Sequence, residues 1–124
     1  SYSGIGGKRS SGYGRFTYEV LDAPECFEQR FTKEYKIYMG LSVCMAGEQE
    51  LDSVVCDSYY QLKRRSGFID SADLAENGYR KKDFYVFTAG SCFSKRFEGD
   101  IFDVSRNGRH PVYRYGKSML MGVM

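Results

Sequence analysis

The sequence predicts an all-α fold, namely a small irregular bundle of about four helices with extended N- and C-terminal arms. Three observations lead to this prediction. Apolar residues recur every three or four positions through the middle of the chain, which is the period of an amphipathic helix. Capping residues, glycines and a proline stand where these stripes begin and end. Both ends of the chain carry segments whose composition or pattern is not helical, and its 124 residues suffice for one domain with its own core.

Residues 1–21 are expected to form an N-terminal arm. Residues 1–14 consist almost entirely of Ser, Gly, Tyr and basic side chains, a composition typical of flexible segments. Residues 15–21 alternate apolar and polar side chains, which predicts a short half-buried strand or an extended segment lying on a partner. The GIGGKRS stretch lacks the first glycine of a phosphate-binding loop, because that position is Tyr2.

Residues 22–104 are expected to form the helical domain, and its first two helices have clear start signals. Asp22 and Pro24 predict the start of a helix whose apolar stripe continues to Met45. The segment Glu48–Arg65 has acidic residues at its start and basic residues at its end, as the helix dipole favours. It is the cleanest helical pattern in the chain.

Two more helices are expected in the second half of this domain. Residues 70–76 have the pattern of a short capped helix that ends at an Asn-Gly pair. Residues 80–97 carry two neighbouring apolar stripes, so this helix is expected to contact both its own core and a partner. Residues 105–124 are interrupted by a His-Pro pair and end in a Met-rich run, which predicts an extended C-terminal tail docked on another surface.

The composition favours a binding surface over a catalytic site. The chain has 11 Tyr and no Trp, and a tyrosine ring with its hydroxyl group suits interfaces. A net charge of +2 is too small for binding nucleic acid through overall charge. The single His, His110, precedes a proline and no nucleophile is marked as activated, so we expect no enzymatic activity. No apolar run approaches the ~20 residues of a membrane span.

The four cysteines do not form a zinc-binding pattern, because no pair has the C-x-x-C spacing. Three states remain open for them: free thiols, disulfide bonds and thioether attachment of a cofactor. A disulfide-bonded state would favour a secreted binding domain, which is one alternative to an assembly protein.

Aromatic and basic side chains indicate where a partner would bind. One apolar stripe of the helix predicted for residues 80–97, the basic end of the preceding helix and the tail each supply such side chains. Aromatic rings beside basic groups also suit single-stranded nucleic acid, which is a further alternative ranked below a protein partner. The predicted partner-binding residues are Phe84, Phe87, Tyr113, Tyr115, Arg64 and Arg65.

One part of the chain resembles a known family. The segment runs from SYYQLKRRSG, through KDF and YVFTAG, to a Ser and a KRF triplet. This order resembles the helical repeat of phycobilisome linker polypeptides, in which a basic helix leads to Arg-Asp-Phe, an apolar run, a Ser and a basic residue before Phe. Lys82 replaces the usual Arg. Because of its cysteines, the chain is most similar among these to red-algal phycoerythrin gamma subunits.

The resemblance implies a non-catalytic scaffold that organises phycobiliprotein hexamers in a light-harvesting, photosynthetic assembly. It implies a chloroplast location, at the stromal face of the thylakoid. We expect no metal site, because of the cysteine spacing described above. The resemblance also implies a covalently bound bilin of the phycoerythrobilin or phycourobilin type, with a cysteine anchor, cations for its propionates and an acid near its pyrrole N–H groups. The implied bilin-binding residues are Cys92, Cys56, Cys44, Asp83, Lys95, Arg96 and Asp52.

Overall fold

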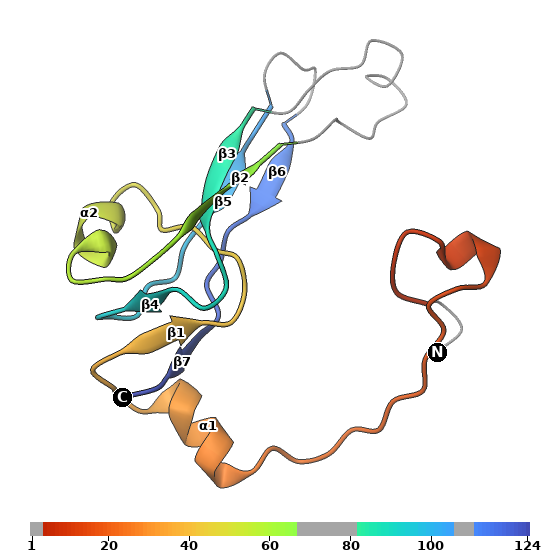
Figure 1. The fold of residues 1–124 in the computed structure, drawn as a ribbon, viewed down its shortest axis with the longest axis horizontal. Helices are drawn as coiled ribbons and strands as arrows, with labels where there is room; N and C mark the ends of the chain where they lie inside the picture. The colour runs from red at the N-terminus through yellow and green to blue at the C-terminus, as the bar shows by residue number, and fades with distance from the viewer. Residues whose placement is uncertain (1–3, 67–81, 106–110) are drawn as a thin grey trace.

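The fold is built mostly from short β-strands (Figure 1). The computed structural model describes residues 4–66, 82–105 and 111–124. Within these residues it contains seven strands, two short α-helices and one 3₁₀ turn. The prediction of an all-α bundle is therefore wrong. The helix predicted for residues 70–76 lies outside the described residues.

A three-stranded antiparallel sheet forms the centre of the molecule. Strand β1 (Tyr38–Gly40) lies between β4 (Cys92–Phe93) and β7 (Leu120–Gly122). Tyr38 is paired with Phe93 on one side and with Gly122 on the other. The sheet thus joins three distant parts of the sequence, including a strand from the segment for which an extended tail is predicted.

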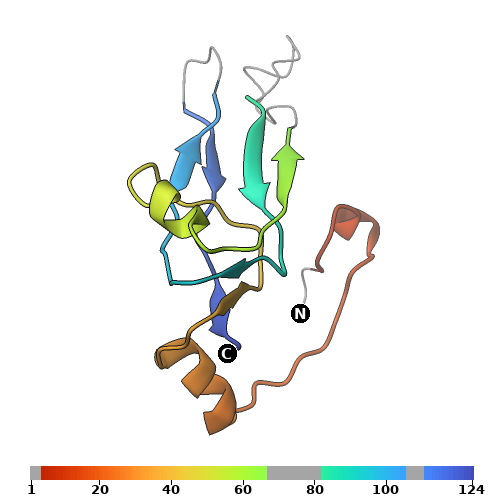
Figure 2. The same cartoon turned by 60° about the vertical axis from the view of Figure 1, so that its left-hand side comes forward.

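Two antiparallel strand pairs project from the central sheet in the same direction (Figure 2). Strand β2 (Leu62–Arg65) pairs with β3 (Phe84–Phe87), and β5 (Ile101–Asp103) pairs with β6 (Tyr113–Tyr115). The two pairs contact each other through the rings of Phe84 and Phe102, whose centroids are 4.6 Å apart. A further contact is the hydrogen bond from the Lys82 N–H to the Val104 carbonyl, at 2.8 Å.

Within the helix predicted for residues 80–97, the described residues 82–97 contain two strands and a turn and no helix. The FYVF run has high β propensity and apolar side chains on both faces, a pattern that helical and strand periods fit equally well. After β3 the chain turns, with a hydrogen bond of 3.2 Å from the Ser91 N–H to the Thr88 carbonyl. Gly90 occupies this turn at a φ of +88°, where a side chain would be strained. β4 follows the turn directly.

The first two predicted helices are real but much shorter than predicted. Helix α1 (Glu25–Thr32) begins after Pro24, and the chain then becomes extended and enters β1. Helix α2 (Leu51–Val55) is followed by Asp57 at a φ of +53°. The Ser58 hydroxyl donates a hydrogen bond of 2.6 Å to the Val54 carbonyl, so a side chain takes the place of the next helical N–H. The chain leaves α2 in an extended conformation and enters β2.

The core lies where β3 and α2 pack against the central sheet. Three phenylalanines, Phe87, Phe93 and Phe97, stack edge to face with ring centroids 5.0 to 6.2 Å apart. Such edge-to-face pairs add to the stabilisation from burial alone. The other buried members of this cluster are Tyr38, Cys44, Ala46, Val54 and Leu120.

The N-terminal arm leaves this body. Residues 4–14 form a loop closed by the Ile5 N–H, which donates to the Gly14 carbonyl at 3.0 Å, and the loop contains the 3₁₀ turn Arg9–Ser11. Residues 15–24 belong to no helix or strand and stand clear of the body in both views (Figures 1 and 2). Among the described residues, no helix is long and apolar enough to cross a membrane.

Candidate functional site

The outer face of the β5–β6 pair is exposed and apolar. Side chains alternate across a strand, so Ile101, Tyr113 and Tyr115 share one face with the exposed Asp103, while Phe102 and Arg114 share the other. The second face is half-buried towards β3, but the first is open. Ile101 is 49% exposed, Tyr113 65% and Tyr115 70%. We call these three side chains the β5–β6 face.

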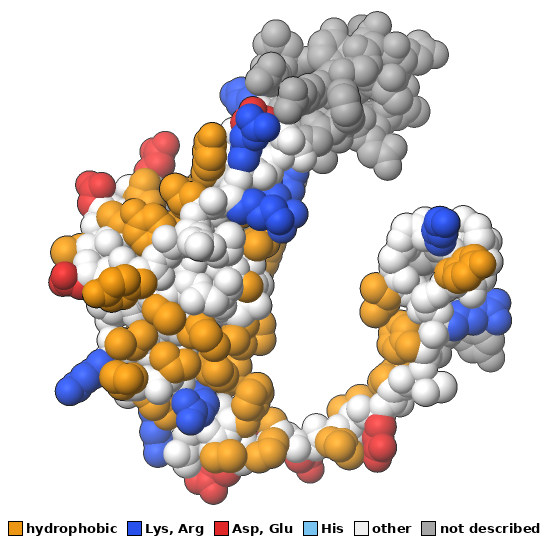
Figure 3. All heavy atoms as spheres, viewed as in Figure 1, with side chains coloured by type: hydrophobic (Ala, Val, Ile, Leu, Met, Phe, Trp, Pro, Cys, Tyr) orange, Lys and Arg blue, Asp and Glu red, His pale blue; other side chains and the backbone are white. Residues whose placement is uncertain are grey.

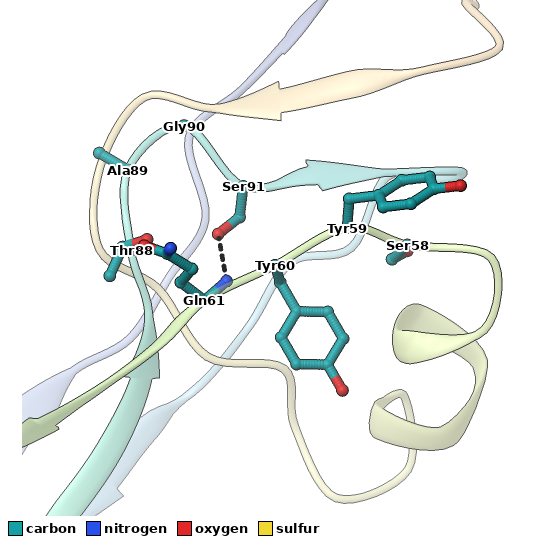
Figure 4. A pocket seen from close by; sticks show the side chains of 8 residues that line it. All are labelled: Ser58, Tyr59, Tyr60, Gln61, Thr88, Ala89, Gly90 and Ser91. Atoms are coloured by element: carbon teal, nitrogen blue, oxygen red, sulfur yellow. Dashed lines mark hydrogen bonds between the residues drawn. The ribbon is translucent and has the colours of Figure 1, made fainter.

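A pocket of about 710 Å³ lies at the base of the β2–β3 pair (Figure 4). Residues 58–61 and 88–91 line it. Tyr59 is 85% exposed, whereas the Tyr60 ring packs edge to face on Phe87 with centroids 5.0 Å apart. The two rings point in different directions in Figure 4. We call this site the tyrosine pocket.

Backbone pairing fixes the walls of the tyrosine pocket. Tyr59 and Cys92 exchange two backbone hydrogen bonds of 2.8 and 2.9 Å. The Gln61 N–H donates to the Ser91 hydroxyl at 3.4 Å, as Figure 4 shows, and the Gln61 carbonyl accepts from the Thr88 N–H at 2.9 Å. The polar backbone is thereby satisfied, and the side chains of Tyr59 and Thr88 remain for contact.

Basic side chains lie next to this pocket on β2. Lys63 and Arg64 are exposed, and Arg64 is directly opposite the exposed Tyr85 of β3. The Arg64 guanidinium is 3.7 Å from the Asp83 carboxylate, an exposed ion pair of small energetic value. The β2–β3 pair therefore presents the basic side chains of β2 next to the exposed Tyr85 ring of β3.

The structure divides the predicted partner-binding residues into two groups. Phe87 is fully buried in the core, and the half-buried Phe84 packs on Phe102. Arg65 is half-buried directly opposite Phe84, on the same face of the β2–β3 pair as that ring. Tyr113, Tyr115 and Arg64 are exposed, but the tyrosines and the arginine belong to different strand pairs.

The cysteines named as bilin anchors occupy three different environments, and all are free thiols. Burial raises the pKa of the Cys44 thiol to about 11, so it stays protonated at neutral pH. Cys92 is half-buried in β4 and Cys56 is exposed after α2. Asp52, in the first turn of α2, and Lys95, after β4, are exposed.

Arg96 is a structural clamp. Its guanidinium donates to the carbonyls of Leu120, Arg30 and Lys33 at 3.2 to 3.3 Å. Its Cζ atom is 4.6 Å from the centroid of the Tyr38 ring. One side chain thus joins α1, β1 and β7, and these backbone contacts leave it poorly placed to bind a propionate.

Glu50 has a comparable role at the other side of the body, and the sequence reading missed it. Its carboxylate accepts hydrogen bonds of 3.3 Å from the N–H groups of Gly47, Glu98 and Gly99. The bond back to Gly47 is half of a capping box, so the three-residue spacing between Gly47 and Glu50 was the available signal. Nothing in the sequence marks the contact with residues 98 and 99. Across the described segments, no cluster of His, Cys, Asp or Glu has the arrangement of a metal site.

The sequence reading also missed Ile101 and Tyr59 as exposed contact residues. The signal for Ile101 was the alternation in IFD and YRY, which marks two strands that share a face. Tyr59 could not be found in the same way, because it was assigned to a helix and its exposure depends on where α2 ends.

The fold and these surfaces define a small β-rich domain with large exposed apolar side chains. The family model of the CRISPR Csm4 C-terminal domain matches residues 33–123. The chain belongs to this family.

Full-length relatives agree with this assignment. Two are described as CRISPR system Cms protein Csm4. The one from Mycobacterium tuberculosis is 37% identical over 98% of this chain and 39% of its own length. The one from Streptococcus thermophilus is 42% identical over 95% of this chain and 40% of its own length. The chain therefore spans about two fifths of these relatives.

A solved structure shares the fold. A chain in the crystal structure of the Csm3-Csm4 subcomplex of the type III-A CRISPR-Cas interference complex superposes with a TM-score of 0.56. It is 23% identical, and the match covers 86% of this chain and 32% of that one.

These findings correct the resemblance to phycobilisome linkers, which is wrong. The KDF segment leads into β3 and the KRF segment lies in the loop after β4, so neither belongs to a helical repeat. The light-harvesting role, the bilin with its proposed ligands and the phycobiliprotein partners are withdrawn with it. The chloroplast location is wrong as well, because the matching relatives come from bacteria and an archaeon.

Proposed function

We propose that this chain is the C-terminal part of a Csm4-type subunit and binds a Csm3-type protein in a type III-A CRISPR-Cas interference complex. The match to the Csm4 C-terminal domain over residues 33–123 carries this proposal. The fold shared with a chain of the Csm3-Csm4 subcomplex supports it. The part of the earlier interpretation that survives is that the protein serves an assembly with protein partners.

The role proposed for this domain is structural and not catalytic. The thiolate is the nucleophilic form of cysteine, and burial keeps Cys44 protonated. The side chains of Arg96 and Glu50, which bond to distant backbone groups, are engaged in holding the fold. The exposed apolar side chains of the surface are instead suited to contact with a partner protein.

We assign the contact with the Csm3-type protein to the β5–β6 face. Tyrosines and large aliphatic side chains are enriched at the centres of protein interfaces, where few residues carry most of the binding energy. Ile101, Tyr113 and Tyr115 provide such a group on one strand pair, with the Asp103 carboxylate at one end of the same face.

The test is a binding titration between the full-length Csm4-type protein and its Csm3-type partner. The double variant Tyr113→Ser and Tyr115→Ser should raise the Kd by roughly 10- to 100-fold, the cost of losing interface tyrosines. The matched control is Tyr85→Ser, an exposed tyrosine on β3, which should leave the Kd unchanged. An unchanged Kd for the double variant would exclude this face. Failure of the wild-type proteins to bind each other would refute the proposed function itself.

The tyrosine pocket favours a second function, contact with single-stranded nucleic acid. An exposed ring with polar groups beside it and basic side chains on the next strand is the combination on which bases stack and phosphates bind. If so, binding of a fluorescent oligonucleotide should weaken steeply with salt, and Tyr59→Ala should weaken it at every salt concentration. Tyr113→Ala, an exposed tyrosine on the other strand pair, is the control outside this surface. Salt-independent binding would argue against this function.

A further inference from the structure

Helix α1 lies on the surface of the body and contributes no buried side chain. Its aromatic residues are Phe27, which is 48% exposed, and Phe31, which is half-buried. Figure 3 shows hydrophobic and acidic side chains on the surface at the lower end of the body, where Figure 1 places α1. A helix of 8 residues is too short to be stable in water by itself, so α1 depends on its contacts with the sheet.

Two guanidinium groups join α1 to the rest of the body. Arg30 donates to the Gly122 carbonyl of β7 at 3.0 Å. Arg96, in the loop after β4, donates to the carbonyls of Arg30 and Lys33 at 3.2 and 3.3 Å. These hydrogen bonds lie at or near the surface, where exchange with bonds to water leaves only a modest net stabilisation for each.

The same two guanidinium groups cover an edge of the central sheet. β7 is an outer strand of that sheet, and alternate residues of β7 bond to β1, so the carbonyls of Leu120 and Gly122 point away from it. They accept hydrogen bonds from Arg96 at 3.3 Å and from Arg30 at 3.0 Å. An uncovered edge strand presents backbone groups to which another strand can add. α1 and its arginine contacts therefore protect this edge.

Immediately after α1, the chain is anchored to the sheet in a different way. The Tyr35 ring packs against the core and lies on the backbone of Gly122, where a Cβ atom would overlap it. The Tyr35 N–H donates to the Tyr38 hydroxyl at 2.8 Å, and the next two N–H groups donate to the Met124 carbonyl at 2.6 and 2.9 Å. Residues 33–34 thus separate a helix held by surface hydrogen bonds from a strand held by backbone pairing and burial.

We propose that α1 is a hinged cap on the β7 edge, which opens at residues 33–34 while the central sheet stays folded. Opening breaks the guanidinium bonds, unfolds the short helix and uncovers the carbonyls of Leu120 and Gly122. The sheet survives because the described core cluster contains no side chain of α1. The match to the Csm4 C-terminal domain begins at the same place, at residue 33. This inference is independent of the proposed contact with a Csm3-type protein.

Hydrogen exchange of the full-length protein, followed by mass spectrometry, tests the proposal. Peptides from residues 25–33 should be at least about 100-fold less protected than peptides from residues 37–41, because a local opening requires less free energy than unfolding of the sheet. Equal protection of the two regions would overturn the proposal, because helix and sheet would then open together. Exchange of residues 25–33 at the rate of an unstructured peptide would overturn it as well, because the cap would then never close.

A variant tests whether the guanidinium bond closes the cap. Arg30→Ala removes the bond to Gly122 and introduces a residue of higher helix propensity, so a loss of protection reports the lost contact. It should lower the protection of residues 25–33 by about 3- to 10-fold and leave that of residues 37–41 unchanged. The matched control is Cys26→Ala, at an exposed position of α1, which should lower neither. Equal losses in both regions, or no loss in Arg30→Ala, would contradict the proposal.

Discussion

At the scale of single residues, Arg96 shows that a charged side chain can stabilise the fold and need not bind a ligand. A basic residue beside a cysteine was interpreted as a ligand for an acidic group, but its guanidinium binds three carbonyls from two separate segments. The planar group can serve several acceptors at once and stack on Tyr38 as well. Which carbonyls it meets depends on the tertiary fold, so local sequence could not have revealed them.

Arg96→Lys should lower the free energy of unfolding by about 1–3 kcal/mol, because an ammonium group cannot bond all three carbonyls in their present places. Chemical denaturation of the variant and the wild type measures this difference. The control is Lys95→Ala at the neighbouring exposed position, which should change the free energy by less than about 0.5 kcal/mol. Equal stability of Arg96→Lys and wild type would show that the clamp is not important for the fold.

At the scale of elements, the sequence predicted where helices begin better than it predicted how long they are or which segments are strands. Pro24 marked the beginning of α1, and the alternation in residues 15–21 was recognised as extended. The strand β3 was misassigned because its run of four apolar side chains satisfies both periods. For β2, the acidic start and basic end of residues 48–65 fitted a helix dipole, yet Asp57 and Ser58 end the helix early. Whether these two segments become helix or strand depends on pairing with distant segments, which the local sequence does not reveal.

The β5–β6 pair contains a group whose titration should loosen it in acid. The Asp103 carboxylate accepts hydrogen bonds from the N–H groups of Ser105 at 2.9 Å and Val112 at 3.3 Å. The bond from Ser105 is the main reason that its pKa lies below the usual 3.8. Because the folded pKa is lowered, the stabilisation is present above 3.8 and is lost as the pH falls through the lower folded value.

We therefore expect the amide of Ser105 to shift in NMR spectra, and to lose protection relative to the intrinsic exchange rate at each pH, as the pH falls below 3.8. Asp103→Asn should remove this titration while keeping an oxygen acceptor. Asp52→Asn, at an exposed site on α2, should leave it unchanged. A Ser105 amide that does not respond to pH would contradict the assignment.

At the scale of the whole molecule, the sequence indicated an assembly with protein partners but not which assembly. Abundant tyrosine and balanced charge pointed to contact surfaces, and Tyr113 and Tyr115 are indeed exposed. The fold and the positions of the other contact residues depended on which distant segments pack together. Residues 82–97 gave a false family resemblance because short motifs of basic and aromatic residues recur in unrelated folds, whereas the match to the Csm4 C-terminal domain extends over residues 33–123.

The position of β7 at the edge of the central sheet has a consequence for biosynthesis. The ribosome produces β1 long before Leu120–Gly122, and β1 has its second neighbour only when those residues have emerged. Until then, Tyr38 and the apolar side chains around it are exposed on an incomplete sheet, a state that is prone to aggregation. Slow translation of the codons between β1 and β7 would prolong this exposure, so synonymous codon choice in that stretch should affect the yield of soluble protein.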